Sequence, residues 1–170
     1  MVGTVLLVND QNRLPNREPQ MSQRRPNSPS LVRMESPDGP ILFAVGGFSE
    51  DSDGLTLEYL KQNSSWLTGP GLPYPVSFSS AVVIGLELFV IGGEHADGIS
   101  DNIFSLNCIP RFGKWKSIGK MRFPRYQHES VSIENQIWTF GGSKFNYGTT
   151  RFEILKLRIF YNFELFQVTS

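Results

Sequence analysis

Phe89-Val90-Ile91-Gly92-Gly93 is the stretch that decides the fold, because the chain repeats it on either side. Residues 43–47 read Phe-Ala-Val-Gly-Gly, and residues 138–142 read Trp-Thr-Phe-Gly-Gly. Aromatic and β-branched residues favour strands, and glycine permits positive φ, so each stretch predicts a strand that ends abruptly. The glycine pairs are 46 and 49 residues apart. A repeat of about this length, built from short strands, is typical of propeller blades.

Tryptophan positions support the repeat. Trp66 precedes Gly92 by 26 residues, and Trp115 precedes Gly141 by the same interval. Each unit therefore predicts four short strands, which in the second unit cover residues 79–84, 88–91, 103–108 and 114–118. We expect the tryptophan of the fourth strand to be buried against the neighbouring blade, because large aromatic side chains dominate such contacts.

The repeat defines the expected domain organisation of an all-β chain. Residues 39–168 are predicted to form three units, at about 39–76, 77–125 and 126–168. The third unit has no tryptophan, and Phe163 is predicted to take its place in the fourth strand. Residues 1–38 hold five prolines and five arginines but no aromatic residue, which predicts a disordered or linker segment. The first unit is therefore expected to lack its first strand.

These units resemble the Kelch repeat. The resemblance is fullest from Trp115 through the turn Met121-Arg122-Phe123-Pro124-Arg125 to Gly141-Gly142, whereas the first unit has Val76 in place of Arg125. It implies an incomplete Kelch β-propeller of about three four-stranded antiparallel blades, the first without its inner strand. Propellers close with at least four blades, so the arc is expected to be completed by self-association or to be a fragment of a longer protein.

The same resemblance implies a protein-interaction module without enzymatic activity, serving as the substrate-recognition part of a cullin-linked ubiquitin ligase adaptor. Its partner, a protein or peptide, would be held by the loops after each glycine pair and by the turns before each first strand. The first two loops are acidic, so we expect a basic or mixed-charge partner. The predicted partner-binding residues are Glu50, Asp51, Asp53, Phe78, Glu94, His95, Asp97, Tyr126, Gln127, Lys144, Asn146 and Tyr147.

Two other functions stay open from the sequence. One is a Kelch-propeller enzyme resembling the sugar epimerases or copper oxidases, although two histidines and one cysteine make a copper site hard to assemble. The other is a truncated product with no function. No metal or other cofactor is expected. Cys108 is interpreted as a small buried apolar residue and His128 as a structural histidine inside a blade.

Charge and hydropathy indicate which partners and which cellular location to expect. Residues 40–110 carry eight acids and one base, whereas residues 111–170 carry ten bases and four acids. Bases alternate with aromatic residues between Arg111 and Arg125, but these aromatics are expected in the core, so no nucleic-acid partner is predicted. No apolar run approaches the length of a membrane span, and a lone cysteine favours a reducing compartment. A cytoplasmic protein without a membrane partner is therefore expected.

Overall fold

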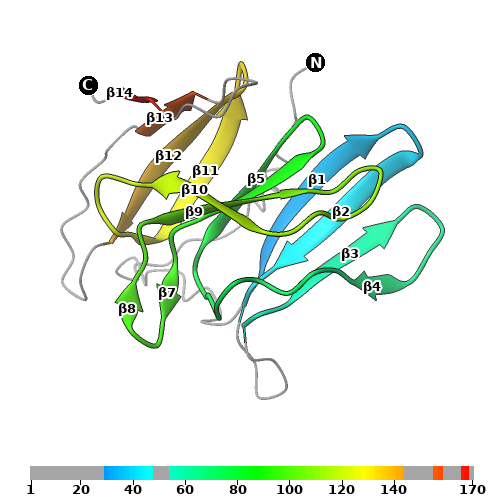
Figure 1. Ribbon diagram of the computed structural model, residues 1–170, viewed down its shortest axis with the longest axis horizontal. Coiled ribbons are helices and arrows are strands. Elements are labelled where there is room, and N and C mark those ends of the chain that lie inside the picture. Colours follow the sequence, from blue (N-terminus) through cyan, green and yellow to red (C-terminus); the bar gives the residue numbers. More distant parts are fainter. Residues whose placement is uncertain (1–28, 48–53, 144–154, 159–165, 169–170) are drawn as a thin grey trace, which may run out of the picture.

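The chain forms three four-stranded antiparallel sheets that follow one another in sequence (Figure 1). The computed structural model describes residues 29–47, 54–143, 155–158 and 166–168. Sheet one comprises β1 (Ser30–Ser36), β2 (Gly39–Val45), β3 (Leu57–Lys61) and β4 (Trp66–Thr68). Sheet two comprises β5 (Ser80–Ile84), β6 (Glu87–Ile91), β9 (Asn102–Asn107) and β10 (Lys116–Lys120). Sheet three comprises β11 (Tyr126–Ile133), β12 (Gln136–Ser143), β13 (Leu155–Arg158) and β14 (Phe166–Val168).

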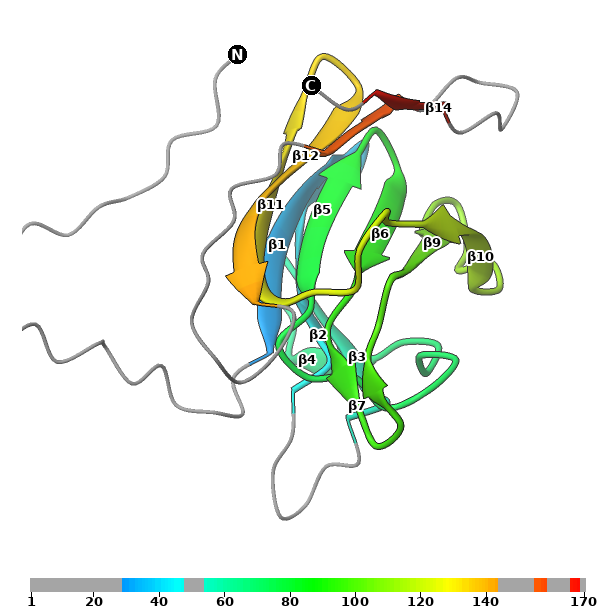
Figure 2. The same cartoon turned by 90° about the vertical axis from the view of Figure 1, so that its left-hand side faces the viewer.

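The sheets are arranged as consecutive blades of an incomplete β-propeller. Sheet two lies between the other two, and the first strand of each sheet lies on the inside of the arc (Figures 1 and 2). β5 contacts both β1 and β11. A small additional hairpin, β7 (Glu94–His95) with β8 (Gly98–Ile99), extends from sheet two. The all-β class and the incomplete propeller predicted from the glycine pairs are confirmed.

The three blades share one pairing register. Phe43, Phe89 and Trp138 occupy equivalent places in the second strands, and each faces a valine of its own first strand. Because cross-strand partners point to the same side of a sheet, corresponding residues of the three blades can be matched one by one. This register decides which side chains face the next blade.

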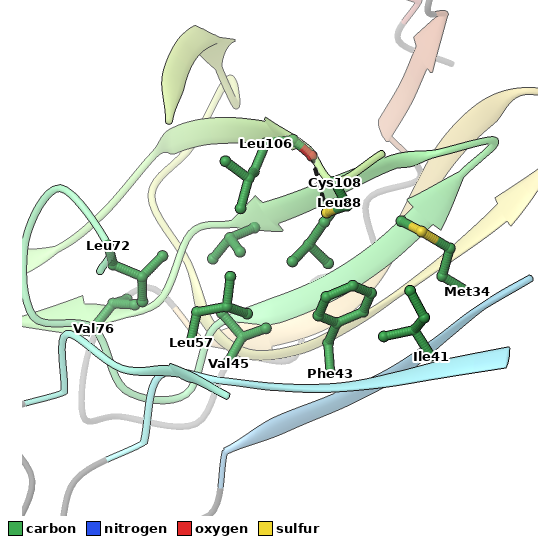
Figure 3. Packing of buried hydrophobic residues seen from close by; sticks show 11 residues of the cluster. Met34, Ile41, Phe43, Val45, Leu57, Leu72, Val76, Leu88, Leu106 and Cys108 are labelled. Carbon is green, nitrogen blue, oxygen red and sulfur yellow. Dashed lines mark hydrogen bonds between the residues drawn. The ribbon is translucent and has the colours of Figure 1, made fainter. Parts of the chain in front are cut away.

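Two apolar clusters join the blades. The first lies between sheets one and two, where Met34, Phe43 and Leu57 face Leu88 and Leu106 (Figure 3). The second lies between sheets two and three and comprises Val82, Phe89, Ile91, Ile103, Met121 and Ile137. Blade-to-blade packing, rather than any single sheet, therefore supplies the core.

The expectation that the first unit lacks its first strand is wrong. β1 lies within the segment predicted as a linker and pairs with β2 along its whole length. Its residues alternate as a half-buried strand requires: Val32 and Met34 face the core, while Arg33 and Glu35 are exposed. The flanking prolines obscured this short alternation in the sequence. Residues 1–28 lie outside the described part of the chain.

The two tryptophans differ in burial. Trp115 is half-buried, and its Nε1 donates a 3.0 Å hydrogen bond to the Pro70 carbonyl, which links sheet two to sheet one. Trp66 is 45% exposed, so the prediction that it is buried against a blade is wrong. Among the described residues, sheet one has a neighbouring sheet on one side only. Phe163 lies outside the described residues, and β14 begins at Phe166.

Candidate functional site

The glycine pairs let the chain pass closely between blades. A Cβ atom on Gly92, whose φ is +57°, would lie 2.6 Å from Met121 Cε and 2.7 Å from the Arg125 carbonyl oxygen. The amide of Gly93 donates to that same carbonyl at 2.9 Å. A side chain at these positions would push apart two neighbouring blades. We call this end of the sheets, where β2, β6 and β12 end and β5 and β11 begin, the glycine edge.

Two non-glycine residues at the glycine edge have strained backbone. Phe78, with a φ of +54°, lies two residues before β5, and Gln127, with a φ of +53°, is the second residue of β11. The Gln127 amide donates a 3.0 Å hydrogen bond to the Phe78 carbonyl, so the two strained residues are directly linked. Such conformations cost on the order of 1–3 kcal/mol each and occur often at functional sites. Recurrence of the same strain in two blades marks this edge as a candidate binding surface.

The acidic β7–β8 hairpin lies beside these residues. Glu94 exchanges backbone hydrogen bonds of 2.8 and 2.9 Å with Ser77, the neighbour of Phe78. His95 Nδ1 accepts a 3.2 Å hydrogen bond from the Asp97 amide and lies 3.8 Å from its carboxylate. The hairpin therefore presents the carboxylate of Asp97 on a fixed turn next to the strained segment.

The described half of the predicted partner-binding set comes together here. Phe78 contacts Tyr126 edge to face, with ring centroids 6.1 Å apart. Asp97 and Gln127 are exposed, and Phe78, Glu94 and His95 are half-buried. Tyr126 is only 9% exposed, so it supports Phe78 more than it offers surface to a partner. The other predicted residues lie outside the described residues: Glu50, Asp51, Asp53, Lys144, Asn146 and Tyr147.

Tyr74 belongs to this surface and was not predicted. Its ring lies 4.9 Å from the His95 ring, centroid to centroid. Its hydroxyl pairs with Ser100 Oγ at 2.7 Å and accepts a 3.0 Å hydrogen bond from Asn102. The sequence did hold a signal, because Tyr74 and Phe123 are aromatic residues at the same place in two successive turns. Tyr74 thus ties the β7–β8 hairpin to the body of sheet two.

His128 lies beneath the glycine edge and is only 3% exposed. Burial, assisted by the positive charge of Arg125, lowers the pKa of His128 from 6.5 to about 3, although the backbone of Ile91 acts in the opposite direction. The side chain is therefore neutral at pH 7. Arg125 also donates a 2.7 Å hydrogen bond to the Gly141 carbonyl, which joins the entry of β11 to the end of β12. His128 and Arg125 are thus buried residues that support the glycine edge.

The buried state of His128 predicts a pH-dependent stability. The unfolded chain takes up a proton near pH 6.5 and the folded chain only near pH 3, so acid favours unfolding between these values. Lowering the pH from 7 to 5 is expected to remove about 2 kcal/mol from the free energy of unfolding through this residue. Urea unfolding at both pH values, compared with His128→Leu, measures this contribution. Equal pH dependence in the two proteins would contradict it.

Other groups with potential chemistry are placed as follows. Cys108 is buried, its Sγ lies 3.4 Å from the Leu106 carbonyl oxygen, and burial raises its pKa to about 12, as expected for an apolar core residue. Within the described ranges, no group of three or more His, Cys, Asp or Glu side chains could hold a metal ion. The part of the chain that the structure describes has no helix of sufficient length and apolarity to cross a membrane.

Comparison with known proteins finds sequence similarity to Kelch-repeat proteins. No protein-family model matches the chain. The chain is 33% identical over 107 residues to Kelch-like protein 35 of Mus musculus, covering 59% of this chain and 18% of that protein. It is 23% identical over 146 residues to Kelch repeat protein M-T8 of Myxoma virus, covering 84% of this chain and 27% of that protein.

A third relative is Kelch repeat and BTB domain-containing protein 12 of Danio rerio, 28% identical over 90 residues, or 48% of this chain and 14% of that protein. The chain thus spans between 14% and 27% of the length of these three relatives. Its three repeated four-stranded sheets place it among incomplete β-propellers. The sequence is similar, over parts of its length, to these Kelch-repeat proteins.

Proposed function

We propose that the chain is a protein-interaction module that holds a partner segment at the glycine edge. The observation that carries this proposal is the linked pair Phe78 and Gln127, held at positive φ beside the exposed carboxylate of Asp97. A surface that stores backbone strain is fixed before the partner arrives, which reduces the entropy lost on binding. The half-buried ring of Phe78 supplies an apolar contact within this surface.

The partner is proposed to be a basic or mixed-charge segment. Glu94 and Asp97 give the described part of the edge an acidic character, and the sequence adds Glu50, Asp51 and Asp53 in the preceding loop. The sequence also places a base, Lys144, directly after the third glycine pair, and this base would favour a partner that also carries an acid. Complementary charge of this kind chiefly sets specificity and the rate of association.

In a longer protein this module would serve as the substrate-recognition part of a cullin-linked ubiquitin ligase adaptor. The support is that two of the relatives carry BTB in their names, Kelch repeat and BTB domain-containing proteins 12 and 1, the latter from Camelpox virus. We also propose a cytoplasmic location, which the single free cysteine supports because reducing compartments keep thiols unpaired.

Replacing Asp97 with alanine should weaken binding of a basic peptide about two- to fivefold at low salt and reduce its salt dependence. The probe is a peptide selected on the wild-type chain from a random display library, with its affinity measured by fluorescence anisotropy at several salt concentrations. A partial loss is expected because exposed charges contribute little individually.

Asp38→Ala is the matched control. Asp38 is also an exposed aspartate in a hairpin turn. Its turn joins β1 to β2, at the end of sheet one that is remote from the glycine edge (Figure 1). This variant should bind the selected peptide as the wild type does. If both variants bind equally well with the same salt dependence, the acidic hairpin is not the recognition surface.

A further inference from the structure

Apolar side chains gather on the two outward sides of the arc. On sheet three they form what we call the trailing face, comprising Val131, Ile133, Trp138 and Phe140, of which Val131 is 40%, Ile133 46% and Phe140 38% exposed. On sheet one they form the leading face, comprising Leu31, Leu42, Leu60 and Trp66, of which Leu31 is 64% and Trp66 45% exposed. Exposed apolar patches of this kind mark interaction surfaces.

The trailing face corresponds to a surface that the chain already buries. In the shared register its four members match Val82, Ile84, Phe89 and Ile91 of sheet two. Those four residues face the second apolar cluster and pack toward Ile137 of sheet three. The trailing face therefore has the composition of a blade surface that another blade covers.

The leading face corresponds to the surface of sheet two that packs against sheet one. Its members match Ala81, Leu88 and Leu106 of sheet two, together with Trp115, which precedes β10. These residues pack against the cluster that joins sheet two to sheet one. The chain thus carries both halves of an interface that it builds twice internally, and among the described residues one half is exposed at each end of the arc.

The first glycine of each pair also differs between covered and uncovered blades. A Cβ atom on Gly46 would lie 2.6 Å from the Val76 carbonyl oxygen, and one on Gly92 would lie 2.6 Å from Met121 Cε. A Cβ atom on Gly141, at the same place in sheet three, would have no atom within 4 Å among the described residues. A backbone position shaped for the close approach of a following blade is therefore open on the trailing side.

We propose that a second copy of this chain covers both faces, so that the trailing face of each copy packs on the leading face of the other. Two arcs of three blades give a ring of six, within the four to eight blades of closed propellers. The two contacts are related by a two-fold axis along the propeller, so the assembly closes as a dimer and does not extend further. This proposal goes beyond partner binding at the glycine edge and does not depend on it.

The contacts between sheets within one chain also predict which residues would meet between the two copies. Ser80 of β5 contacts Ser130 of β11, with their hydroxyl oxygens 2.6 Å apart. The matching positions at the new contact are Glu129 of one copy and Leu31 of the other. Two residues further along both strands, Val131 would lie beside Arg33, which now forms a 2.8 Å ion pair with Glu35 on the exposed leading face.

This pairing gives a test on the full chain. Sedimentation velocity of the wild type should show a species of twice the 19.2 kDa mass of one chain. Val131→Lys would set a lysine beside Arg33, and Leu31→Glu would set a carboxylate beside Glu129. Each variant is expected to raise the dissociation constant of the dimer by roughly tenfold to a hundredfold, because like charges then lie within an apolar contact.

Two further variants make the test specific to the head-to-tail arrangement. Adding Arg33→Glu to Val131→Lys places opposite charges together and should restore the dimer. Leu86→Lys is the control, since Leu86 is 37% exposed in the β5–β6 turn and belongs to neither face, so this variant should remain dimeric. Circular dichroism checks that all variants keep their β-sheet content.

The remaining outcomes overturn the proposal. A wild type that stays at the mass of one chain up to about 100 µM means that no second copy covers the faces. Dissociation by Val131→Lys without rescue by Arg33→Glu means that the trailing faces pair with each other instead. Species that keep growing beyond two chains with concentration mean that the head-to-tail contact does not close.

Discussion

Replacing Phe89 with alanine is expected to lower the free energy of unfolding by about 3–5 kcal/mol. The side chain is 1% exposed and lies in the second apolar cluster, among Ile91, Ile103 and Ile137. Its removal takes away apolar burial and leaves a cavity between two sheets, which cannot close without moving a whole blade. Urea unfolding followed by circular dichroism measures the loss as a lower midpoint.

Leu86→Ala provides the comparison for Phe89→Ala. Leu86 is an apolar residue in the turn of the same hairpin, but it is 37% exposed and outside both clusters. Its truncation should change the free energy of unfolding by about 0.5 kcal/mol or less. Similar midpoints for the two variants would mean that sheets two and three do not pack through Phe89.

Gly92→Ala is expected to lower the free energy of unfolding by about 3 kcal/mol. Part of this loss, about 1 kcal/mol, is the strain of placing a side chain at a φ of +57°. The rest comes from overlap, because the new Cβ would lie 2.7 Å from the Arg125 carbonyl oxygen and 2.8 Å from His128 Cε1. A thermal or urea melt of the purified variant measures the total.

Gly85→Ala separates the two contributions. Gly85 has almost the same φ, +59°, but a Cβ atom there would meet nothing within 4 Å. This variant should therefore lose only the conformational part, about 1 kcal/mol. If Gly92→Ala were no worse than Gly85→Ala, the close approach of sheet three to the end of β6 would be incorrect.

The glycine pairs made sheets two and three predictable. They fix where the second strands end, and the apolar alternation before them fixes the first strands, since each is joined to the second by a short turn. The β11–β12 turn illustrates this, because Glu134 and Asn135 both have positive φ, as a two-residue hairpin turn requires. The sequence was sufficient to predict those strands and turns whose conformation depends on residues close to them in the chain.

The features that were missed depend on distant neighbours or on very short segments. β1 has only two residues facing the core, and sheet pairing with β2 decides its conformation more than its own composition does. Trp66 and Trp115 look equivalent in the sequence, but only Trp115 has a sheet in front of it within the described residues. Tyr74 matches the aromatic Phe123 of the next turn, but this match does not reveal its contact with the His95 ring, which brings Tyr74 into the candidate site.

The candidate site was predicted by family resemblance more than by residue chemistry. Phe78 and Gln127 were identified as turn residues, yet nothing in a phenylalanine or a glutamine indicates positive φ. Only the structure shows that the two strained positions match across blades and are joined by a hydrogen bond. The acidic hairpin, by contrast, could be anticipated because Glu94 and Asp97 stand in a polar loop directly after a glycine pair.

Each sheet uses strands from one continuous part of the chain, and none of the described strands crosses from one sheet to another. During synthesis, sheet one can therefore be completed while the segment for sheet three is still inside the ribosome. Pairing within each sheet closes only short loops, so its entropic cost is small. Each new blade then meets a finished surface on the one before it, and the arc can grow in the order in which the ribosome makes it.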